Sequence, residues 1–315
     1  PKKKSGWLYA GISVAVVCVA ALVALGLYFM KRPMSDSEII SKYEKSVGLL
    51  AVEYHFEVNC GHLLFDKFVL GEDGIVEYDG ENSMKSQGTG FFVGNSGAIV
   101  TNRHMARPWE AMDLDFGTAV LPIEEMAEIC FREALTELYE DGCTEALPYI
   151  SQVDVHGVVD NIVVIPNGKY VYNVINCAEV ACSPKDEDLA VLKILTDQLP
   201  VNVTPVPLDK IVYVEPEKGA HVLTIGFPKG LDLQTDIEKK EIQAHTTSGS
   251  ITRNDNKYLF GLDAVSSAGA SGSPVFDEYG NLMGVLNSGY DTQGFNFGVR
   301  SEYVVALLKA TGILE

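Results

Sequence analysis

The most constraining feature of this sequence is a succession of short segments rich in β-branched and aromatic residues, most of them bounded by Gly, Asn, Asp or Pro. These segments lie at 47–58, 89–101, 161–166, 169–175, 221–227 and 281–289. Because helices do not alternate with them, the pattern predicts antiparallel sheets closed into barrels rather than a parallel sheet. Asn167 and Gly168 separate two of these segments and predict a tight hairpin turn.

Three segments have a helical pattern instead. The first, 35–46, offers Ser35 or Ser37 as an N-cap residue and leads into the folded domain. In 123–140 apolar residues recur at helical spacing, which predicts a packing face, and 301–312 has a similar apolar pattern. The fold class predicted by these elements is all-β with a helical insertion.

An uncharged apolar stretch covers residues 5–30. As a helix it would span about 37 Å, against about 30 Å for the hydrocarbon core of a bilayer. A cleaved signal peptide is the alternative, but the stretch is longer than usual and no small-x-small cleavage site follows it. We therefore expect a single-pass anchor at the cell membrane, with residues 1–4 cytoplasmic, 31–46 a linker, and 47–315 periplasmic or extracellular.

Charge and cysteine content bear on partners and on the redox compartment. The 43 acidic and 24 basic residues give a net charge of −19, which argues against nucleic acid as a partner. In an oxidising compartment the simplest disulfides would join Cys130 to Cys143 and Cys177 to Cys182, leaving Cys60 free. Zinc is the alternative use of these cysteines, but neither C-x-x-C spacing nor paired histidines occur. We expect no metal and no other cofactor.

A candidate nucleophile lies in GASGSPVF, residues 269–276. The glycines on both sides of Ser271 allow the backbone to fold sharply, so that the amides of Gly269 and Ser271 can point at one spot and stabilise an oxyanion. A small-residue β-turn without chemistry explains this motif alone equally well.

A histidine and an aspartate complete the set. His104 follows an apolar strand in TNRHMA, and Asp188 heads the strand DLAVLKI, with Asp186 and Glu187 as nearby alternatives for the acid. Either residue alone could be structural. However, the order His, Asp, Ser, with separations of 84 and 83 residues, matches one of the known arrangements of the Ser-His-Asp triad.

The segments TGFFVGNSGAIVTNRHMA, DLAVLKI and GASGSPVFDEYGNLMGVLNSG resemble the three motif blocks of bacterial trypsin-like peptidases, in particular the HtrA/Deg proteases and the staphylococcal glutamyl endopeptidases. The resemblance covers most of residues 45–312. It implies two packed six-stranded β-barrels of the chymotrypsin type, the first at about 47–200 and the second at about 201–300. Residues 107–160 look like an insertion, which we expect to pad the first barrel rather than cap the cleft.

The resemblance also implies a mechanism. Ser271 would attack a peptide carbonyl, His104 would transfer the proton to the leaving amine, and Asp188 would stabilise the imidazolium. Ala270 stands where these families usually have Asn or Asp, which excludes activation by a new N-terminal amine pairing there. HtrA proteases usually continue into a PDZ domain, whereas this sequence stops at Glu315, so we expect no such module to deliver substrate.

A specificity pocket is implied beside the nucleophile, with no acid at its base, which argues against cleavage after Lys or Arg. Its expected lining residues are Val265, Ser266, Leu286, Asn287, Ser288 and Gly289. Leu286 stands where the glutamyl endopeptidases resemble one another in having His, which argues against a strict preference for Glu. We expect small or medium apolar side chains at the cleaved position. The predicted function is a serine endopeptidase acting on proteins or peptides in quality control or processing. The alternatives are a catalytically silent peptide-binding scaffold and a serine esterase.

Overall fold

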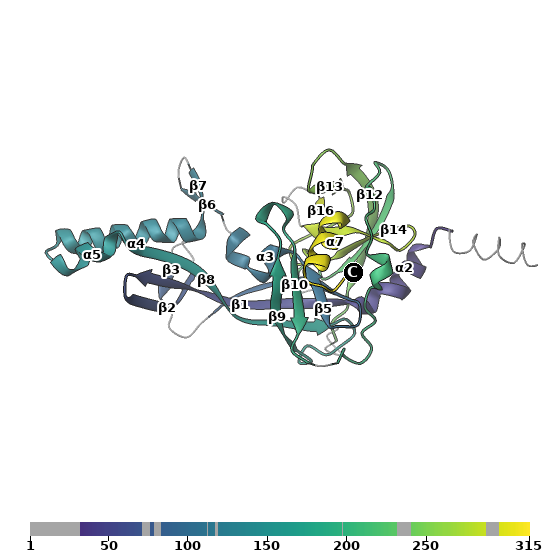
Figure 1. Cartoon of the computed structure of the whole chain (residues 1–315), viewed down its shortest axis with the longest axis horizontal. Coiled ribbons are helices and arrows are strands. Elements are labelled where there is room, and N and C mark those ends of the chain that lie inside the picture. The colour runs from purple at the N-terminus through teal and green to yellow at the C-terminus, as the bar shows by residue number, and fades with distance from the viewer. Residues whose placement is uncertain are drawn as a thin grey trace, which may run out of the picture.

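Two closed antiparallel barrels form the body of the molecule, as predicted (Figure 1). The computed structural model describes residues 32–70, 76–78, 83–111, 113–116, 119–196, 198–231, 241–287 and 296–315. The predicted membrane anchor, residues 5–30, lies outside this part of the chain. Within the described ranges, no helix combines the length and apolar character that crossing a bilayer requires.

The first barrel closes because β1 pairs with β8 as well as with β4. Its six strands, in ring order, are β1 (Val47–Cys60), β4 (Met84–Val93), β5 (Ala98–Thr101), β10 (Ala190–Ile194), β9 (Ile175–Cys182) and β8 (Val153–Pro166). The second barrel closes in the order β11 (His221–Gly226), β12 (His245–Arg253), β13 (Leu259–Leu262), β16 (Asn296–Arg300), β15 (Leu282–Asn287) and β14 (Pro274–Asp277).

Two helices at the ends of the described chain support the barrels. Helix α2 (Asp36–Tyr43) begins at Ser35, whose side chain and Glu38 form the reciprocal pair of a capping box. Helix α7 (Ser301–Ala310) packs against β10, β15 and β16. Both predicted helices are therefore present. An apolar cluster that includes Leu49, Phe91, Leu223 and Phe276 draws residues from both barrels and packs them against each other.

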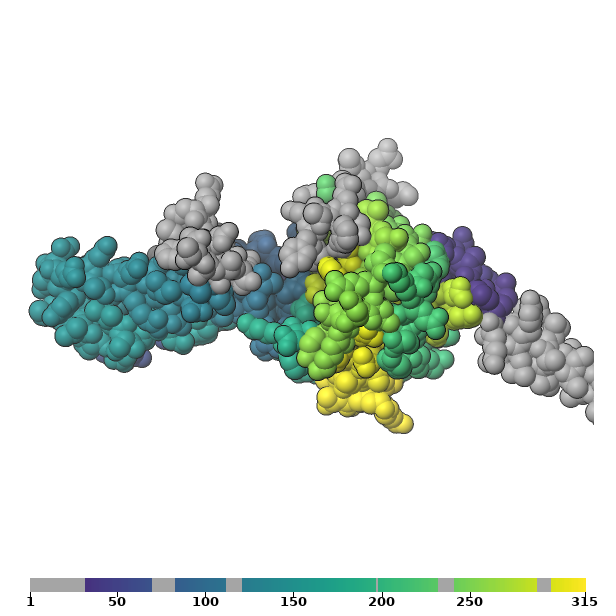
Figure 2. Space-filling model, turned by 90° about the horizontal axis from the view of Figure 1, so that it is seen from above, coloured from purple at the N-terminus to yellow at the C-terminus, as the bar shows by residue number. Residues whose placement is uncertain are grey.

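A projecting arm extends the first barrel away from the second (Figures 1 and 2). We define the arm as the described residues between 54 and 78 and between 119 and 160. It contains the outer halves of β1 and β8, together with β2 (Leu63–Leu70), β3 (Val76–Tyr78), β7 (Ala119–Pro122), α4 (Ile123–Glu140) and α5 (Leu147–Ile150). Strand β7 pairs with β6 (Asp113–Phe116). Short helix α3 (Arg103–Ala106) lies where the arm meets the barrel.

The insertion therefore does not pad the first barrel. Helix α4 has the predicted bounds, but it packs on β8 and shares an apolar cluster with Tyr54, Phe56 and Trp109 that is separate from the barrel core. The sequence pattern did not reveal that β1 and β8, each 14 residues long, run through both the barrel and the arm.

The predicted hairpin at Asn167 and Gly168 is wrong. Strand β8 ends at Pro166 and β9 begins only at Ile175, so a longer loop joins them. The amide of Lys169 closes a turn on the carbonyl of Pro166 at 3.2 Å, in which Gly168 has a positive φ of 71° and the other central residue is Asn167. Its side-chain amide donates to the carbonyl of Glu44 and its side-chain oxygen accepts from the amide of Ala244, so Asn167 ties separate segments together.

Neither suggested disulfide is formed, because Cys60, Cys130, Cys143, Cys177 and Cys182 are all free thiols. Cys177 and Cys182 both lie on strand β9, where five residues of extended chain separate their Cα atoms by about 16 Å. A disulfide needs Cα atoms within about 7 Å. Cys130 lies within helix α4, whose remaining turns carry the chain away before Cys143.

Candidate active site

His104 and Asp188 meet at the end of strand β5. Asn102 caps helix α3 with an extended backbone, and His104 is the second residue of that helix. The backbone N–H of His104 donates to Oδ1 of Asp188 at 2.9 Å, and Nδ1 lies 2.8 Å from Oδ2. The carboxylate thus holds both the main chain and the ring. With the proton on Nδ1, Nε2 is left as the basic nitrogen.

The backbone of Asp188 is fixed in an unusual conformation. Its φ of 43° and ψ of 52° are left-handed, which costs a non-glycine residue free energy, although less for Asp than for most others. Asn102 donates its side-chain amide to the carbonyl of Asp188 at 3.0 Å. Ser183 accepts the amide of the next residue, Leu189, at 2.9 Å. Asp188, and not Asp186 or Glu187, is therefore the acid that the fold directs to His104.

Ser271 lies in a sharp turn in the second barrel. Gly269 and Gly272 flank it with φ values of 90° and 86°, which glycine adopts readily. The carbonyl of Ala270 accepts both the amide of Ser273 at 3.1 Å and its hydroxyl at 2.6 Å. Ser271 itself is 3% exposed. The predicted small-residue turn is therefore present, and it is built around the candidate nucleophile.

Thr89, a fully buried residue of the first barrel, joins this turn to the histidine. Its amide donates to the carbonyl of Ser271 at 2.8 Å, and its hydroxyl donates to the carbonyl of Gly269 at 2.9 Å. Its own carbonyl accepts the hydroxyl of Thr101, three residues before His104, at 2.7 Å. The serine turn is thus fixed against the strand end from which the histidine emerges.

A cleft of about 240 Å³ opens at this junction. Its lining comes from both barrels: Arg103, His104, Glu110, Ala111, Lys185, Asp188 and Asn287. Asn287, predicted for the specificity pocket, therefore lies on the same cleft as the histidine and the aspartate. The guanidinium of Arg103 forms a bidentate ion pair with the carboxylate of Glu110. Burial raises the pKa of Glu110, but these hydrogen bonds outweigh it and leave the pKa lowered.

The predicted specificity pocket is only partly formed by the expected residues. Val265 and Leu286 line a cavity of about 10 Å³, which has room for about one water molecule. Ser266 does not line this cavity, although its hydroxyl is buried without a hydrogen-bond partner among the described residues. Ser288 and Gly289 lie outside the described residues.

Several lining residues were not predicted. Thr224, His245 and Thr247 come from strands β11 and β12 and line the same small cavity. Thr89, Arg103 and Glu110 were missed at the cleft, although Thr89 lies in the first motif block and Arg103 directly precedes His104. Their roles depend on contacts across the two barrels, which no local sequence pattern encodes.

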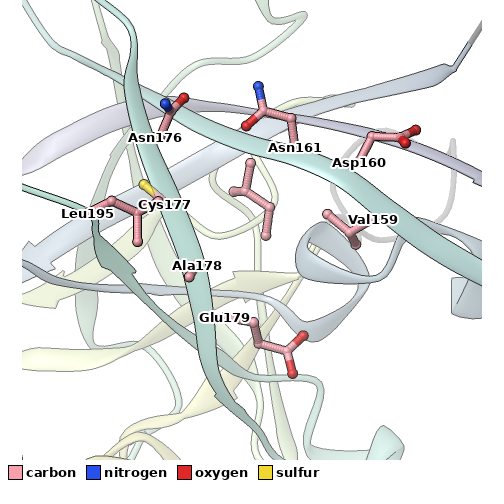
Figure 3. A pocket seen from close by; sticks show the side chains of 9 residues that line it. Val159, Asp160, Asn161, Asn176, Cys177, Ala178, Glu179 and Leu195 are labelled. Carbon is pink, nitrogen blue, oxygen red and sulfur yellow. The ribbon is translucent and has the colours of Figure 1, made fainter.

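A second cavity, of about 380 Å³, has a different location (Figure 3). It lies between β8 and β9, where residues such as Asn161, Asn176 and Cys177 line it. None of the three triad candidates contributes to it. Its size alone does not make it the active site, since it lacks a nucleophile paired with a base.

Two packed antiparallel barrels with a His–Asp pair and a serine turn at their junction define a chymotrypsin-like peptidase domain. Residues 88–285, more than half of the chain, match the family described as trypsin-like peptidase domain, and the chain belongs to that family. The matched range includes His104, Asp188 and Ser271. No curated protein matches the sequence. Among solved structures, the chain is similar to the serine endoprotease from Yersinia pestis, with 16% identity and a TM-score of 0.49 over 89% of this chain and 68% of that one.

Proposed function

We propose that this chain is a serine endopeptidase that cleaves peptide bonds through an acyl-enzyme on Ser271. The observation that carries the proposal is the paired contact of Asp188 with His104, at 2.9 Å to the backbone amide and 2.8 Å to the ring. This contact orients an imidazole for general-base catalysis, and Thr89 holds the glycine-flanked turn of Ser271 against the same strand end. Membership in the trypsin-like peptidase family supports protein or peptide substrates.

In this mechanism His104 removes the proton of the Ser271 hydroxyl as the oxygen attacks the carbonyl carbon. Asp188 stabilises the resulting imidazolium, and the amides of Gly269 and Ser271 stabilise the oxyanion. His104 then donates its proton to the leaving amine, and a water molecule hydrolyses the ester by the same steps in reverse order. The cavity beside Leu286 has room for little more than one water molecule, which supports a preference for small side chains.

Active-site labelling tests this proposal. Wild-type protein would be treated with a fluorophosphonate probe, and its hydrolysis of casein and of a simple ester would be measured in parallel. Ser271→Ala and His104→Ala should abolish labelling and both activities. Ser248→Ala, which removes an exposed hydroxyl from β12, should leave them unchanged. Ser271-dependent ester hydrolysis without casein hydrolysis would favour an esterase, and wild-type protein that is not labelled would favour a silent scaffold.

We also propose that residues 5–30 anchor the peptidase domain to the membrane on its outer side. The support is the length and the uncharged character of this stretch. In membrane fractions, the full chain should resist extraction by alkaline carbonate, whereas a chain starting at residue 32 should not pellet with membranes. A protease added to intact cells or spheroplasts should degrade the anchored domain. Protection of the domain until the cells are lysed would refute the proposed orientation.

A further inference from the structure

His55 is a buried histidine on the polar side of the arm. Along β1, Tyr54, Phe56 and Val58 point into the apolar cluster of the arm, so that His55 and Glu57 lie on the opposite side of the strand. That side would normally be solvated, yet His55 is only 4% exposed. A titratable ring is therefore enclosed by polar neighbours at a place that is not part of the catalytic cleft.

Two β-bulges produce this enclosure. The β1–β8 pairing shifts register between Glu53 and Tyr54, which leaves Asp160 without a partner opposite in β1. The β1–β2 pairing shifts again between Phe56 and Val58, which inserts Asp66 and Lys67. Lys67 has a φ of 65°, a left-handed conformation that is costly for lysine. Bulges of this kind redirect side chains, and both direct acids toward His55.

Three potential ligand atoms converge on the Nε2 side of the ring. Nε2 of His55 lies 2.7 Å from Oδ1 of Asp66 and 3.9 Å from Oε1 of Glu57, and the three residues offer ligand atoms within 4.8 Å of one another. The His55 side chain is 5% exposed, and although Nε2 is within ion-pair distance of Asp66, no neighbour among the described residues meets it with hydrogen-bond geometry. In a tetrahedral zinc site, N and O ligands at about 2.0–2.2 Å from the metal are about 3.3 Å apart. The observed distances from Nε2 to the two carboxylate oxygens, 2.7 Å and 3.9 Å, lie on either side of this value.

One outer contact of the cluster, a carboxylate on the other ring nitrogen, is usual for a metal-binding histidine, and the ammonium of Lys67 also lies 3.3 Å from that nitrogen. Nδ1 of His55 lies 3.0 Å from Oδ2 of Asp160, whose other oxygen accepts from Lys67 at 2.6 Å. The second oxygen of Glu57 lies 3.2 Å from Nε2 of His156. A carboxylate on the far nitrogen fixes the tautomer so that the near nitrogen can bind a metal.

We propose that His55, Glu57 and Asp66 form a binding site for a divalent transition-metal ion of the zinc type, with Asp160 as the residue that orients His55. With a neutral His55, the carboxylates of Glu57, Asp66 and Asp160 together with the ammonium of Lys67 carry a net charge of −2, which a divalent cation neutralises. Asp66 is 53% exposed and provides access from solvent. The ion would join β2 to β1 at the bulge and stabilise the arm.

Zinc binding by the full chain tests this proposal. Protein stripped with a chelator would be titrated with Zn²⁺, and retained metal would be measured by mass spectrometry after gel filtration, with thermal unfolding as a second readout. Wild-type protein should retain one zinc ion and melt at a higher temperature with zinc. His55→Ala and Asp66→Asn should lose both effects. Asp160→Asn should weaken binding by about 10–100-fold.

The matched control is His221→Ala, which removes a histidine that contacts an acid at 2.8 Å outside the arm, and it should bind zinc normally. If His55→Ala fails to fold, Asp66→Asn decides the test, because this half-exposed side chain can be changed without opening a cavity. Equal zinc retention by wild type and Asp66→Asn, as expected for binding at cysteines, would overturn the proposal. A wild-type protein that binds no zinc would overturn it as well, and the cluster would then be an ion-pair network around an imidazolium.

Discussion

Replacing Asp188 with Asn tests whether the two hydrogen bonds to His104 set the activity of the site. The carboxylate accepts from the His104 amide with one oxygen and from Nδ1 with the other. An asparagine has only one side-chain oxygen, so its NH₂ group must face one of these two nitrogens. If the oxygen keeps the backbone amide, the NH₂ group faces Nδ1 and forces the ring proton onto Nε2. The ring then cannot accept the proton of Ser271.

The expected loss is large because it affects the protonation of the catalytic base. A histidine held in the wrong tautomer typically lowers kcat about 10⁴-fold, which corresponds to about 5.5 kcal/mol in the activation free energy. The fold should survive, because asparagine adopts the left-handed conformation of residue 188 at least as well as aspartate. The melting temperature should therefore change little while turnover collapses.

The assay is the steady-state hydrolysis of a fluorogenic peptide derived from casein, with circular dichroism melts of each variant. The matched control is Asp186→Asn, which changes an exposed carboxylate two residues away and should keep kcat within about twofold of wild type. Activity of Asp188→Asn within tenfold of wild type would refute the role assigned to the contact. An equal loss in both variants would show that local charge, and not the geometry of the hydrogen bonds, sets the rate.

Three further outcomes follow from the structure. Gly272→Ala would place a Cβ 2.0 Å from a backbone oxygen at a φ of 86°, so urea unfolding should show that the free energy of unfolding falls by at least about 2 kcal/mol. In the control Gly168→Ala the new Cβ meets open space at a φ of 71°, and the free energy of unfolding should fall by only about 1 kcal/mol. Burial raises the pKa of Asp160, but hydrogen bonds from a lysine, a serine and a histidine lower it to about 2. The pKa of Asp160 in the folded protein is thus below its unfolded value of about 3.9, so its contribution to stability is present above pH 4 and is lost as the pH falls toward 2. Without metal, the melting temperature of Asp160→Asn should therefore depend less on pH between 4 and 2 than that of the wild type. In a thiol titration at pH 8, exposed Cys143 should react in the fast phase, and Cys143→Ser should remove one fast-reacting thiol. Cys177 should react slowly, because burial raises its pKa to about 12.

The barrels and the His–Asp pair were predictable because their determinants are local. Alternating apolar strands bounded by turn residues predict antiparallel sheets, and His104 and Asp188 each stand at the end of a recognisable strand. The helices were equally accessible, since α4 has the predicted bounds and α2 begins at one of its two predicted caps. The fold that the family resemblance implied is confirmed by the match over residues 88–285.

The rest could not be predicted because it depends on pairing over long separations. Nothing in the sequence near Cys177 and Cys182 shows that one strand holds both and keeps them apart. The role of Thr89 depends on a serine 182 positions later, and the role of Asn167 depends on residues 44 and 244. The cluster at His55 was missed for a similar reason, since a bulge in β2 delivers Asp66.

The continuity of β1 and β8 relates the arm to the catalytic barrel. The inner half of β1 pairs with β4, which carries Thr89, and its outer half carries His55. The register shift between Glu53 and Tyr54 separates these halves, so that one strand serves two apolar clusters. A cation that fixed the bulge would therefore act on the stability of the arm first, and on catalysis only through the shared strand.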